Sequence, residues 1–379
     1  MPHPVIETLF EQLEAALRQD PARPLFTDDV PVYIYGAGNV GKDVFRLLTG
    51  RGIRVAGFLD RQAKPSSVWQ EIPVLIPDDP AISPAERKRG HVVIGIFNRE
   101  AEIPPIRKFL KSLGYERVAS FLDLHDRFAS ELGDRFWLTS RGFYRDQKEQ
   151  ITAGYELFSD EASRELYAAV LRFRFSKDYA ALPAPNLDDQ YFPTGLPPWP
   201  SPIRFVDCGA YDGDTLRQLF DRQVPIEAIA AFEPDPINFQ KLAQSASSRA
   251  LNTAAMVCLF PCGVSSTTTQ IRFSSGQGSS SRASENGDTV IQCVALDEAL
   301  AAFRPNVIKM DIEGAEYEAL LGARRTIERH RPGLALCVYH RPEHLWTIPL
   351  LAKAWLKGGH HYLRAHAHSA FELVYYWVP

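Results

Sequence analysis

The sequence feature that most constrains the fold is the stretch IRFVDCGAYDGD at residues 203–214. Its apolar run ends on Asp207, a short turn with Gly209 and Gly213 follows, and a helical pattern begins at Thr215. This order predicts a buried strand, a tight turn and the start of a helix. The glycines allow the backbone to approach a ligand without a Cβ atom in the way. The free N–H groups of the helix N-terminus suit an anionic or carboxylate-bearing ligand.

A second apolar strand follows and ends on Glu233. The D-x-G-x-x-x-G-D spacing of the first turn differs from the G-x-G-x-x-G fingerprint of dinucleotide-binding folds. An acid at the tip of the second strand is placed to hydrogen-bond both hydroxyls of a ribose. The combination resembles the S-adenosylmethionine site of class I methyltransferases. The predicted cofactor site also includes residues that flank these motifs and a Cys-Gly pair after the expected third strand: Tyr211, Asp214, Thr215, Pro234, Asp235, Cys262 and Gly263.

Length and composition indicate a soluble globular protein. The 379 residues favour two or three domains, and the chain is 45% hydrophobic and 23% charged. A net charge of −4 offers no positive surface for nucleic acid, and no apolar stretch is long enough to span a bilayer. The N-terminal twenty residues form an acidic amphipathic helix pattern and lack the segments of a signal peptide. We interpret the five cysteines as buried thiols of a cytoplasmic protein: Cys208, Cys258, Cys262, Cys293 and Cys337.

Residues 1–125 carry a second nucleotide-type motif. A strand pattern runs into a G-x-G-x-x-G turn, a helix pattern follows, and the next strand ends on an acid. This predicts a Rossmann-like unit whose site residues are Gly36, Gly38, Asn39, Val40, Gly41 and Asp60. The stretch Gly57-Phe-Leu-Asp60 resembles the small Rossmann domains found on sugar acyltransferases and other polysaccharide-biosynthesis proteins. That resemblance implies a nucleotide or nucleotide-sugar ligand, with NAD as a rival. A domain that lost its ligand and serves for docking or homodimer formation is the alternative.

Residues 126–202 are predicted to be a helical segment followed by an extended connector. Ser159 is the expected N-cap of a helix in which Leu166, Val170 and Phe173 recur at helical spacing. Prolines then crowd the chain up to residue 202 and preclude regular helix. An aromatic pair at residues 191–192 fits either a substrate mouth or a surface anchor.

A Ser- and Gly-rich insertion follows the expected third strand of the last domain, residues 203–379. One interpretation is a mobile hairpin loop. The other is a substrate loop, in which Ser279, Ser280, Ser281 and Arg282 meet polar substrate groups.

The stretch NVIKMDIEGAE predicts a further buried strand that delivers Asp311 at its carboxyl end. Glu313 and Glu316 follow as a helix begins, and carboxylates in a first helical turn also complement the helix dipole. The next strand ends near His340.

Residues 150–379 resemble the FkbM family of S-adenosylmethionine-dependent methyltransferases. The resemblance rests on VDCGAYDGDT, AFEPDP, IKMDIEGAEYEAL and the ending ELVYYWVP. It implies an α/β fold whose seven-stranded class I sheet has an antiparallel last strand, and O-methylation of a small molecule or saccharide, such as a polysaccharide precursor. The cofactor-binding positions that carry over are Asp207, Gly209, Gly213, Glu233 and Asp311.

Methyl transfer requires alignment of the acceptor oxygen, the methyl carbon and the sulfur, and a base that removes the hydroxyl proton. The candidates for that base are Asp311, Glu313 and His340, all expected at the carboxyl edge of the sheet. His340 is alternatively a structural hydrogen-bonding residue, and Asp311 alternatively holds the methionine end of the cofactor. We expect no metal site, because the C-terminal histidines lack a zinc motif: His340, His344, His360, His361, His366 and His368.

Two rival functions stay open. One is a sensor or adaptor that binds NAD or a nucleotide-sugar and has a non-catalytic methyltransferase-like domain. The other is an NAD-dependent sugar-modifying enzyme that uses both Rossmann units.

Overall fold

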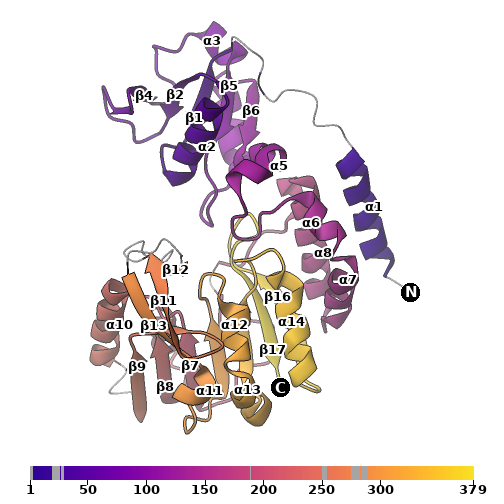
Figure 1. Cartoon of the computed structure of the whole chain (residues 1–379), viewed down its shortest axis with the longest axis vertical. Helices are drawn as coiled ribbons and strands as arrows, with labels where there is room; N and C mark the ends of the chain where they lie inside the picture. Colours follow the sequence, from indigo (N-terminus) through magenta and orange to yellow (C-terminus); the bar gives the residue numbers. More distant parts are fainter. Residues whose placement is uncertain are drawn as a thin grey trace. The chain divides into compact units, whose positions relative to one another are not determined.

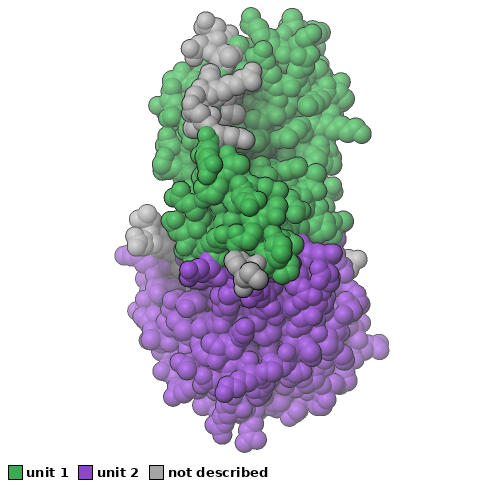
Figure 2. Space-filling model, turned by 90° about the vertical axis from the view of Figure 1, so that its right-hand side faces the viewer, with its two compact units in different colours: residues 1–148, 168–184, 367–371 green, residues 149–167, 185–366, 372–379 purple. Residues whose placement is uncertain are grey.

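A computed structural model of the chain describes residues 3–18, 26, 30–187, 189–249, 254–274, 282–283 and 289–379. Two compact units divide the chain, and Figure 2 colours them separately. Unit 1 consists of residues 1–148, 168–184 and 367–371, and unit 2 consists of residues 149–167, 185–366 and 372–379. The division expected from the sequence, at 125/126 and 202/203, stays a prediction.

Unit 1 contains a six-stranded sheet in the order β3-β4-β2-β1-β5-β6 (Figure 1). β1 pairs in parallel with β2 and β5, and only the β3–β4 pair is antiparallel. The strand order reverses at β1, as in a doubly wound Rossmann-type sheet. The strands are β1 (Val32–Tyr35), β2 (Val55–Leu59), β3 (Val68–Trp69), β4 (Ile72–Leu75), β5 (His91–Ile94) and β6 (Arg117–Ser120).

The helices of unit 1 include the amphipathic N-terminal helix expected from the sequence. α1 (Pro4–Arg18) buries Ile6, Leu9, Phe10 and Leu13 along one face. The others are α2 (Asn39–Gly50), α3 (Pro84–Arg89), α4 (Ile103–Ser112), α5 (Phe121–Leu132), α6 (Arg141–Arg145) and the 3₁₀ turn η1 (Tyr179–Ala181).

Two helices belong to both units: α7 (Lys148–Leu157) and α8 (Glu161–Ser176). The expected N-cap of α8 was wrong by one residue. Asp160 Oδ1 accepts from the backbone N–H of Ser163 at 2.9 Å, which is the N-cap interaction. Ser159 Oγ instead accepts from the backbone N–H of His361 at 2.9 Å, so it ties the chain to a strand.

Unit 2 contains a seven-stranded sheet in the order β16-β17-β15-β14-β7-β8-β9. All pairs are parallel except those of β17, which is antiparallel to β15 and β16. The expected α/β class and antiparallel last strand are confirmed. The strands are β7 (Ile203–Cys208), β8 (Ile226–Phe232), β9 (Met256–Phe260), β14 (Val307–Met310), β15 (Gly333–Cys337), β16 (His360–Ala365) and β17 (Leu373–Val378).

Helices cover this sheet, as its central strands require. β14 and β15 are buried along their whole length, which is typical of parallel strands covered on both faces. The helices are α9 (Asp214–Asp221), α10 (Pro236–Arg249), α11 (Leu296–Ala299), α12 (Glu316–Leu321), α13 (Arg324–His330) and α14 (His344–Trp355). α9 packs against α10, and α14 packs against α12 and α13.

A small second sheet in unit 2 has the order β10-β13-β11-β12. Its strands are β10 (Gly263–Val264), β11 (Thr269–Ser274), β12 (Arg282–Ala283) and β13 (Thr289–Val294). β11 and β13 form an antiparallel pair on either side of the Ser- and Gly-rich insertion.

The structure also shows the state of the cysteines, the position of two C-terminal histidines and the character of the helices. The five cysteines are free thiols, and all but the half-buried Cys258 are buried. His366 and His368 follow the end of β16 and belong to no strand. Within the described residues, no helix combines the length and the apolar character needed to cross a lipid bilayer.

Gly41 tests the packing of α2 on the unit 1 sheet. A Cβ atom at Gly41 would lie 2.0 Å from the carbonyl oxygen of Gly36, whereas a Cβ atom at Gly50 of the same helix would meet nothing within 4 Å. We expect Gly41→Ala to lower the free energy of unfolding by at least about 2 kcal/mol through overpacking. Gly50→Ala should leave it within about 1 kcal/mol or raise it. Urea unfolding of both variants measures this, and equal stabilities would contradict it.

Candidate functional site

The predicted acids of unit 2 meet at one edge of its sheet. β7 lies between β8 and β14, and β14 pairs in parallel with β15. The carboxyl ends of these four strands therefore bring together Asp207, Glu233, Asp311 and His340. This is the edge at which open α/β sheets bind ligands.

Asp207 is fully buried and forms an ion pair with Lys309 of β14. Lys309 Nζ lies 2.9 Å from Asp207 Oδ1 and donates to the carbonyl oxygen of Gly209 at 2.6 Å. Burial lowers the pKa of Lys309, but the carboxylates of Asp207 and Asp311 outweigh it and raise the pKa above its usual range. Lys309 is therefore charged. Direct binding of a cofactor by Asp207 stays a prediction. Within the protein, Asp207 pairs with Lys309, which bonds the loop at Gly209.

The backbone conformation and the packing of the first turn require glycine at two positions. Gly209 and Gly213 have φ angles of 81° and 85°, which L side chains rarely adopt. A Cβ atom at Gly209 would lie 1.9 Å from the carbonyl oxygen of Asp311. Glycine is therefore required at residue 209 by the close packing of the turn after β7 against the end of β14. Free approach of a ligand, the reason expected from the sequence, stays a prediction.

Glu233 holds this turn in place from the end of β8. Its carboxylate oxygens accept from the backbone N–H groups of Tyr211 at 2.8 Å and Asp235 at 2.9 Å. Burial raises the pKa of Glu233 to about 7, and those two N–H donors oppose the shift. The acid keeps further lone pairs, so ribose binding stays a prediction.

Among the other predicted cofactor residues, Asp235 and Asp214 bond backbone N–H groups, whereas the Thr215 side chain does not. Asp235 caps α10, because its Oδ1 accepts from the N–H groups of Ile237 at 2.9 Å and Asn238 at 3.1 Å. Asp214 accepts from the N–H of Thr215 at 2.8 Å. Thr215 Oγ1 is buried and makes no hydrogen bond within the described part of the chain, and ligand binding by Thr215 stays a prediction.

The Cys262-Gly263 pair lies beside Pro234, which follows Glu233. A Cβ atom at Gly263 would lie 3.9 Å from Pro234 Cβ and 2.9 Å from Cys293 Sγ. Cys262 is buried beside it. Cys262, Gly263 and Pro234 therefore lie along the same edge of the site.

A buried imidazole lies at the centre of the predicted catalytic residues. His340 Nδ1 lies 2.7 Å from Glu316 Oε1, and its Nε2 lies 3.4 Å from Asp311 Oδ1 and 3.9 Å from Glu313 Oε1. Glu316 Oε2 also lies 3.2 Å from His344 Nδ1. All three base candidates are therefore in one cluster.

The charges of this cluster assign different protonation states to its members. Burial lowers the pKa of His340, but the carboxylates of Glu316 and Glu313 outweigh it and raise the pKa to about 10. Burial raises the pKa of Glu313 to about 7. His340 and His344 outweigh the burial of Glu316 and hold its pKa well below its usual range. At neutral pH His340 is a cation and Glu316 an anion, and Glu313 exchanges its proton.

Exposure separates Asp311 and Glu313 from the buried pair. Their side chains are 23% and 18% exposed, against 1% for His340 and 0% for Glu316. Glu313 has a φ angle of 54°, in the left-handed region that is strained for a residue other than glycine. A substrate can therefore reach Asp311 and Glu313.

Sequence reasoning missed three residues of this region, Gln190, Lys309 and Glu372, and it named Tyr191 only as one of an aromatic pair with two possible roles. Tyr191 donates its hydroxyl to Asp311 Oδ2 at 2.8 Å. Glu372 accepts from the Tyr339 hydroxyl at 3.0 Å and from the side-chain amide of Gln190. The aromatic pair in the Pro-rich connector was the one signal available for Tyr191, and its position in the chain gave no partner.

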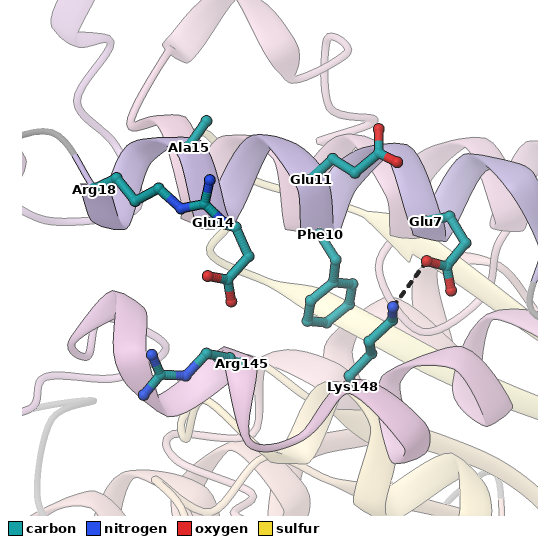
Figure 3. A pocket seen from close by; sticks show the side chains of 8 residues that line it. All are labelled: Glu7, Phe10, Glu11, Glu14, Ala15, Arg18, Arg145 and Lys148. Atoms are coloured by element: carbon teal, nitrogen blue, oxygen red, sulfur yellow. Dashed lines mark hydrogen bonds and ion pairs between the residues drawn. The ribbon is translucent and has the colours of Figure 1, made fainter.

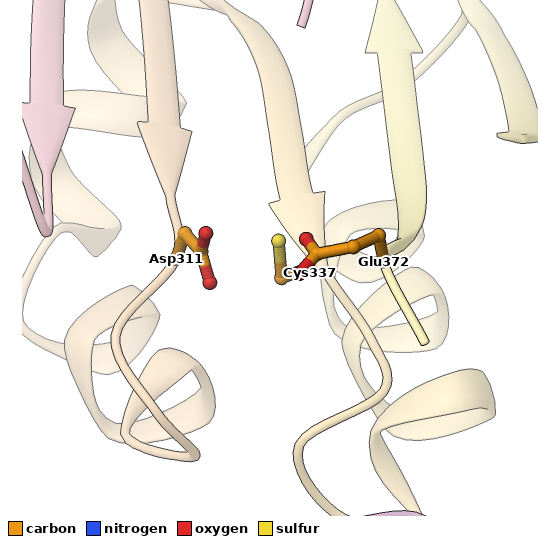
Figure 4. Close-up of side chains that lie close together, drawn as sticks. All are labelled: Asp311, Cys337 and Glu372. Atoms are coloured by element: carbon orange, nitrogen blue, oxygen red, sulfur yellow. The ribbon is translucent and has the colours of Figure 1, made fainter. Parts of the chain in front are cut away.

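Two groups of side chains in the described residues have the spacing of a metal site. One is Asp311, Cys337 and Glu372 (Figure 4), and the other is Asp311, Glu316 and His340. Burial and nearby carboxylates raise the pKa of the Cys337 thiol well above its usual range. His340 is protonated, and the carboxylates accept the hydrogen bonds described above. These donor sets suit a hydrogen-bond network better than a metal ion.

The predicted N-terminal site residues also lie together. Gly36 and Gly38 lie in the turn between β1 and α2, with Gly38 as the N-cap, and Asn39, Val40 and Gly41 begin α2. Asp60 Oδ2 accepts from the N–H of Ala37 at 3.2 Å, so the acid after β2 contacts this turn. Ligand binding by the turn stays a prediction.

The predicted substrate loop is not assessed by the structure. Ser279, Ser280 and Ser281 and the side chain of Arg282 lie outside the described residues, and the backbone of Arg282 belongs to β12.

A groove of about 370 Å³ lies in unit 1 (Figure 3). It is lined by Glu7, Phe10, Glu11, Glu14, Ala15, Arg18, Arg145 and Lys148. An ion pair of 2.8 Å between Glu7 and Lys148 joins α1 to α7 there. None of the predicted site residues lines this groove.

Comparisons with known proteins identify a domain that contains this edge of the unit 2 sheet. Residues 207–365 match the family model described as the Methyltransferase FkbM domain, so the expected FkbM methyltransferase domain is confirmed. The fold is similar to the crystal structure of Methyltransferase FkbM from Methylobacillus flagellatus KT, with a TM-score of 0.76 and 19% sequence identity over 99% of each chain. At that identity the likeness concerns the fold alone. No curated protein sequence matches the chain.

The protonation state of His340 is open to direct measurement. Its pKa of about 10 predicts an imidazolium ¹⁵N spectrum at pH 7.5, whereas His361, whose pKa burial lowers to about 4, should be neutral. Glu316→Gln removes the nearest anion and should return His340 toward its ordinary range near 6.5. Because its folded-state pKa is raised, His340 stabilises the fold fully below about pH 6.5, and this share is lost as the pH rises through about 10. A neutral His340 at pH 7.5 would contradict the assignment.

Proposed function

We propose, on the premise that residues 207–365 form an FkbM methyltransferase domain, that the chain is an S-adenosylmethionine-dependent O-methyltransferase. Its acceptor is a hydroxyl of a sugar, a polysaccharide precursor or another small molecule. The observation that carries the proposal is the pair of accessible carboxylates, Asp311 and Glu313, beside the turn that Glu233 holds.

The residues of the first turn fit the cofactor. Glu233 has oxygen lone pairs for ribose hydroxyls, Thr215 has a buried hydroxyl still able to bond a ligand, and Cys262 and Gly263 border the adenine side. When bound, S-adenosylmethionine supplies a methyl group activated by its sulfonium charge. The carboxylates of this edge attract that positive charge in a partly buried setting.

Glu313 is the proposed proton acceptor. Its pKa of about 7 places it near neutral pH, where a general base is most effective. His340 is protonated, so it orients the two carboxylates and does not act as the base. Asp311, which is already bonded by Tyr191, accepts a hydrogen bond from the acceptor and orients it. Alignment of the acceptor accounts for most of the gain.

Three wider proposals accompany this function. The turn at Gly36–Gly41 binds a nucleotide-sugar or NAD, which would connect the enzyme to polysaccharide biosynthesis. The chain forms a homodimer through its N-terminal half. It works in the cytoplasm, which the five free thiols support.

Cofactor binding is tested by calorimetry on the full chain with S-adenosylhomocysteine, NAD and UDP-sugars. We expect S-adenosylhomocysteine to bind, and Glu233→Gln to weaken its binding by about 10-fold, because a charged hydrogen bond is lost. Glu227→Gln in β8, the strand before Glu233, is the control, since Glu227 pairs with Arg204 on the surface. Binding of NAD without S-adenosylhomocysteine would favour the sensor or adaptor.

The proton acceptor is tested by the pH dependence of S-adenosylhomocysteine formation. Because a base must be deprotonated, the rate should rise with pH through about 7. Glu313→Gln should lower kcat by about 100-fold or more and remove this rise. Glu318→Gln, on the exposed face of α12, serves as the control. A Glu313→Gln variant with an unchanged pH profile would exclude Glu313.

A further inference from the structure

Tyr191 reaches the site from a segment that the family match does not cover. It belongs to the Pro-rich stretch before β7, whereas the matched domain begins at residue 207. Its side chain is buried, and its backbone oxygen accepts from Trp199 Nε1 at 2.8 Å. The Trp199 ring in turn fills the space beside Gly333, where a Cβ atom would lie 2.5 Å from it. The stretch is therefore fixed against the sheet and is not a loose connector.

Tyr191 contacts Asp311 directly and Asp207 through Lys309. Its hydroxyl donates to Asp311 Oδ2 at 2.8 Å and accepts from Gln190 Nε2 at 3.0 Å. Lys309 Nζ lies 5.1 Å from the centroid of its ring, within the range of a cation–π interaction, and Lys309 pairs with Asp207. Burial and the carboxylate of Asp311 raise the pKa of Tyr191 well above its usual range, so its hydroxyl stays a donor.

Asp311 is consequently bracketed by two donors. Tyr191 bonds Oδ2, and the protonated His340 faces Oδ1 at 3.4 Å. A carboxylate that is 23% exposed would otherwise populate several rotamers. The hydrogen bond to Oδ2 and the ion pair at Oδ1 together favour one orientation of the carboxylate.

We propose that Tyr191 is a positioning residue for methyl transfer, which fixes the Asp311 carboxylate against the acceptor hydroxyl. This inference rests on the proposed function. It extends the functional site beyond the matched domain, into residues 189–202. Tyr191 acts through Asp311 and not on the acceptor itself.

The test is a comparison of Tyr191→Phe with Tyr375→Phe in the full chain. Tyr375 is also fully buried in unit 2, and its hydroxyl makes a bond of 2.7 Å to His361 Nδ1, away from the site. Both variants should lose similar stability. Only Tyr191→Phe should lower kcat, by about 10-fold, with the KM for S-adenosylmethionine within about 2-fold of the wild type.

The assay follows transfer of a tritiated methyl group to free hexoses, methyl glycosides and UDP-hexoses. In an Asp311→Asn background, Tyr191→Phe should cost less than about 2-fold more, because the residue acts through Asp311. An equal loss in both backgrounds, or no loss in either, would overturn the proposal. If the wild-type chain transfers no methyl group and binds no S-adenosylhomocysteine, the proposed function itself fails.

Crystal structures with S-adenosylhomocysteine provide a readout independent of turnover. In Tyr191→Phe, the Asp311 side chain should rotate or occupy two conformers, while the backbone of β14 stays in place. An Asp311 carboxylate in the wild-type position would overturn the inference.

Discussion

The ion pair between Asp207 and Lys309 is the interaction on which the rest of the site depends. Both side chains are buried, so loss of either one would leave an uncompensated charge, at a cost of about 3–5 kcal/mol. Lys309 also bonds the carbonyl oxygen of Gly209 and lies over the ring of Tyr191. Lys309 thus contacts both the turn after β7, at Gly209, and the Pro-rich stretch before β7, at Tyr191.

The sequence was sufficient where the signals are local. The run that ends on Asp207, the strand that ends on Glu233 and the strand that ends on Asp311 each carry their own hydrophobic pattern and turn residues. Once these strands are parallel, their carboxyl ends must share an edge. The meeting of Asp207, Glu233, Asp311 and His340 follows from that geometry alone.

The remaining features depend on contacts between distant residues, which no local pattern encodes. Tyr191 and Asp311 are separated by 120 residues, and Gln190 and Glu372 by 182. Lys309 reads as a charged interruption of a strand until its partner is known. The N-cap of α8 shows the same limit at short range. Ser159 and Asp160 are both good caps, and the bond from His361 to Ser159 decides between them.

The acids of the site differ in exposure, and this difference suits them to different roles in the proposed reaction. Transfer of a methyl group removes a sulfonium charge and releases one proton from the hydroxyl, so the total charge is unchanged. A site that attracts the first cation can therefore retain the second. Glu316 is unsuited to receive that proton, because it is buried and bonded to His340. Glu313 is accessible and has a pKa of about 7. The buried Glu316–His340 pair keeps its charges and sets the electrostatic potential of the site. The accessible Glu313 exchanges the proton with solvent.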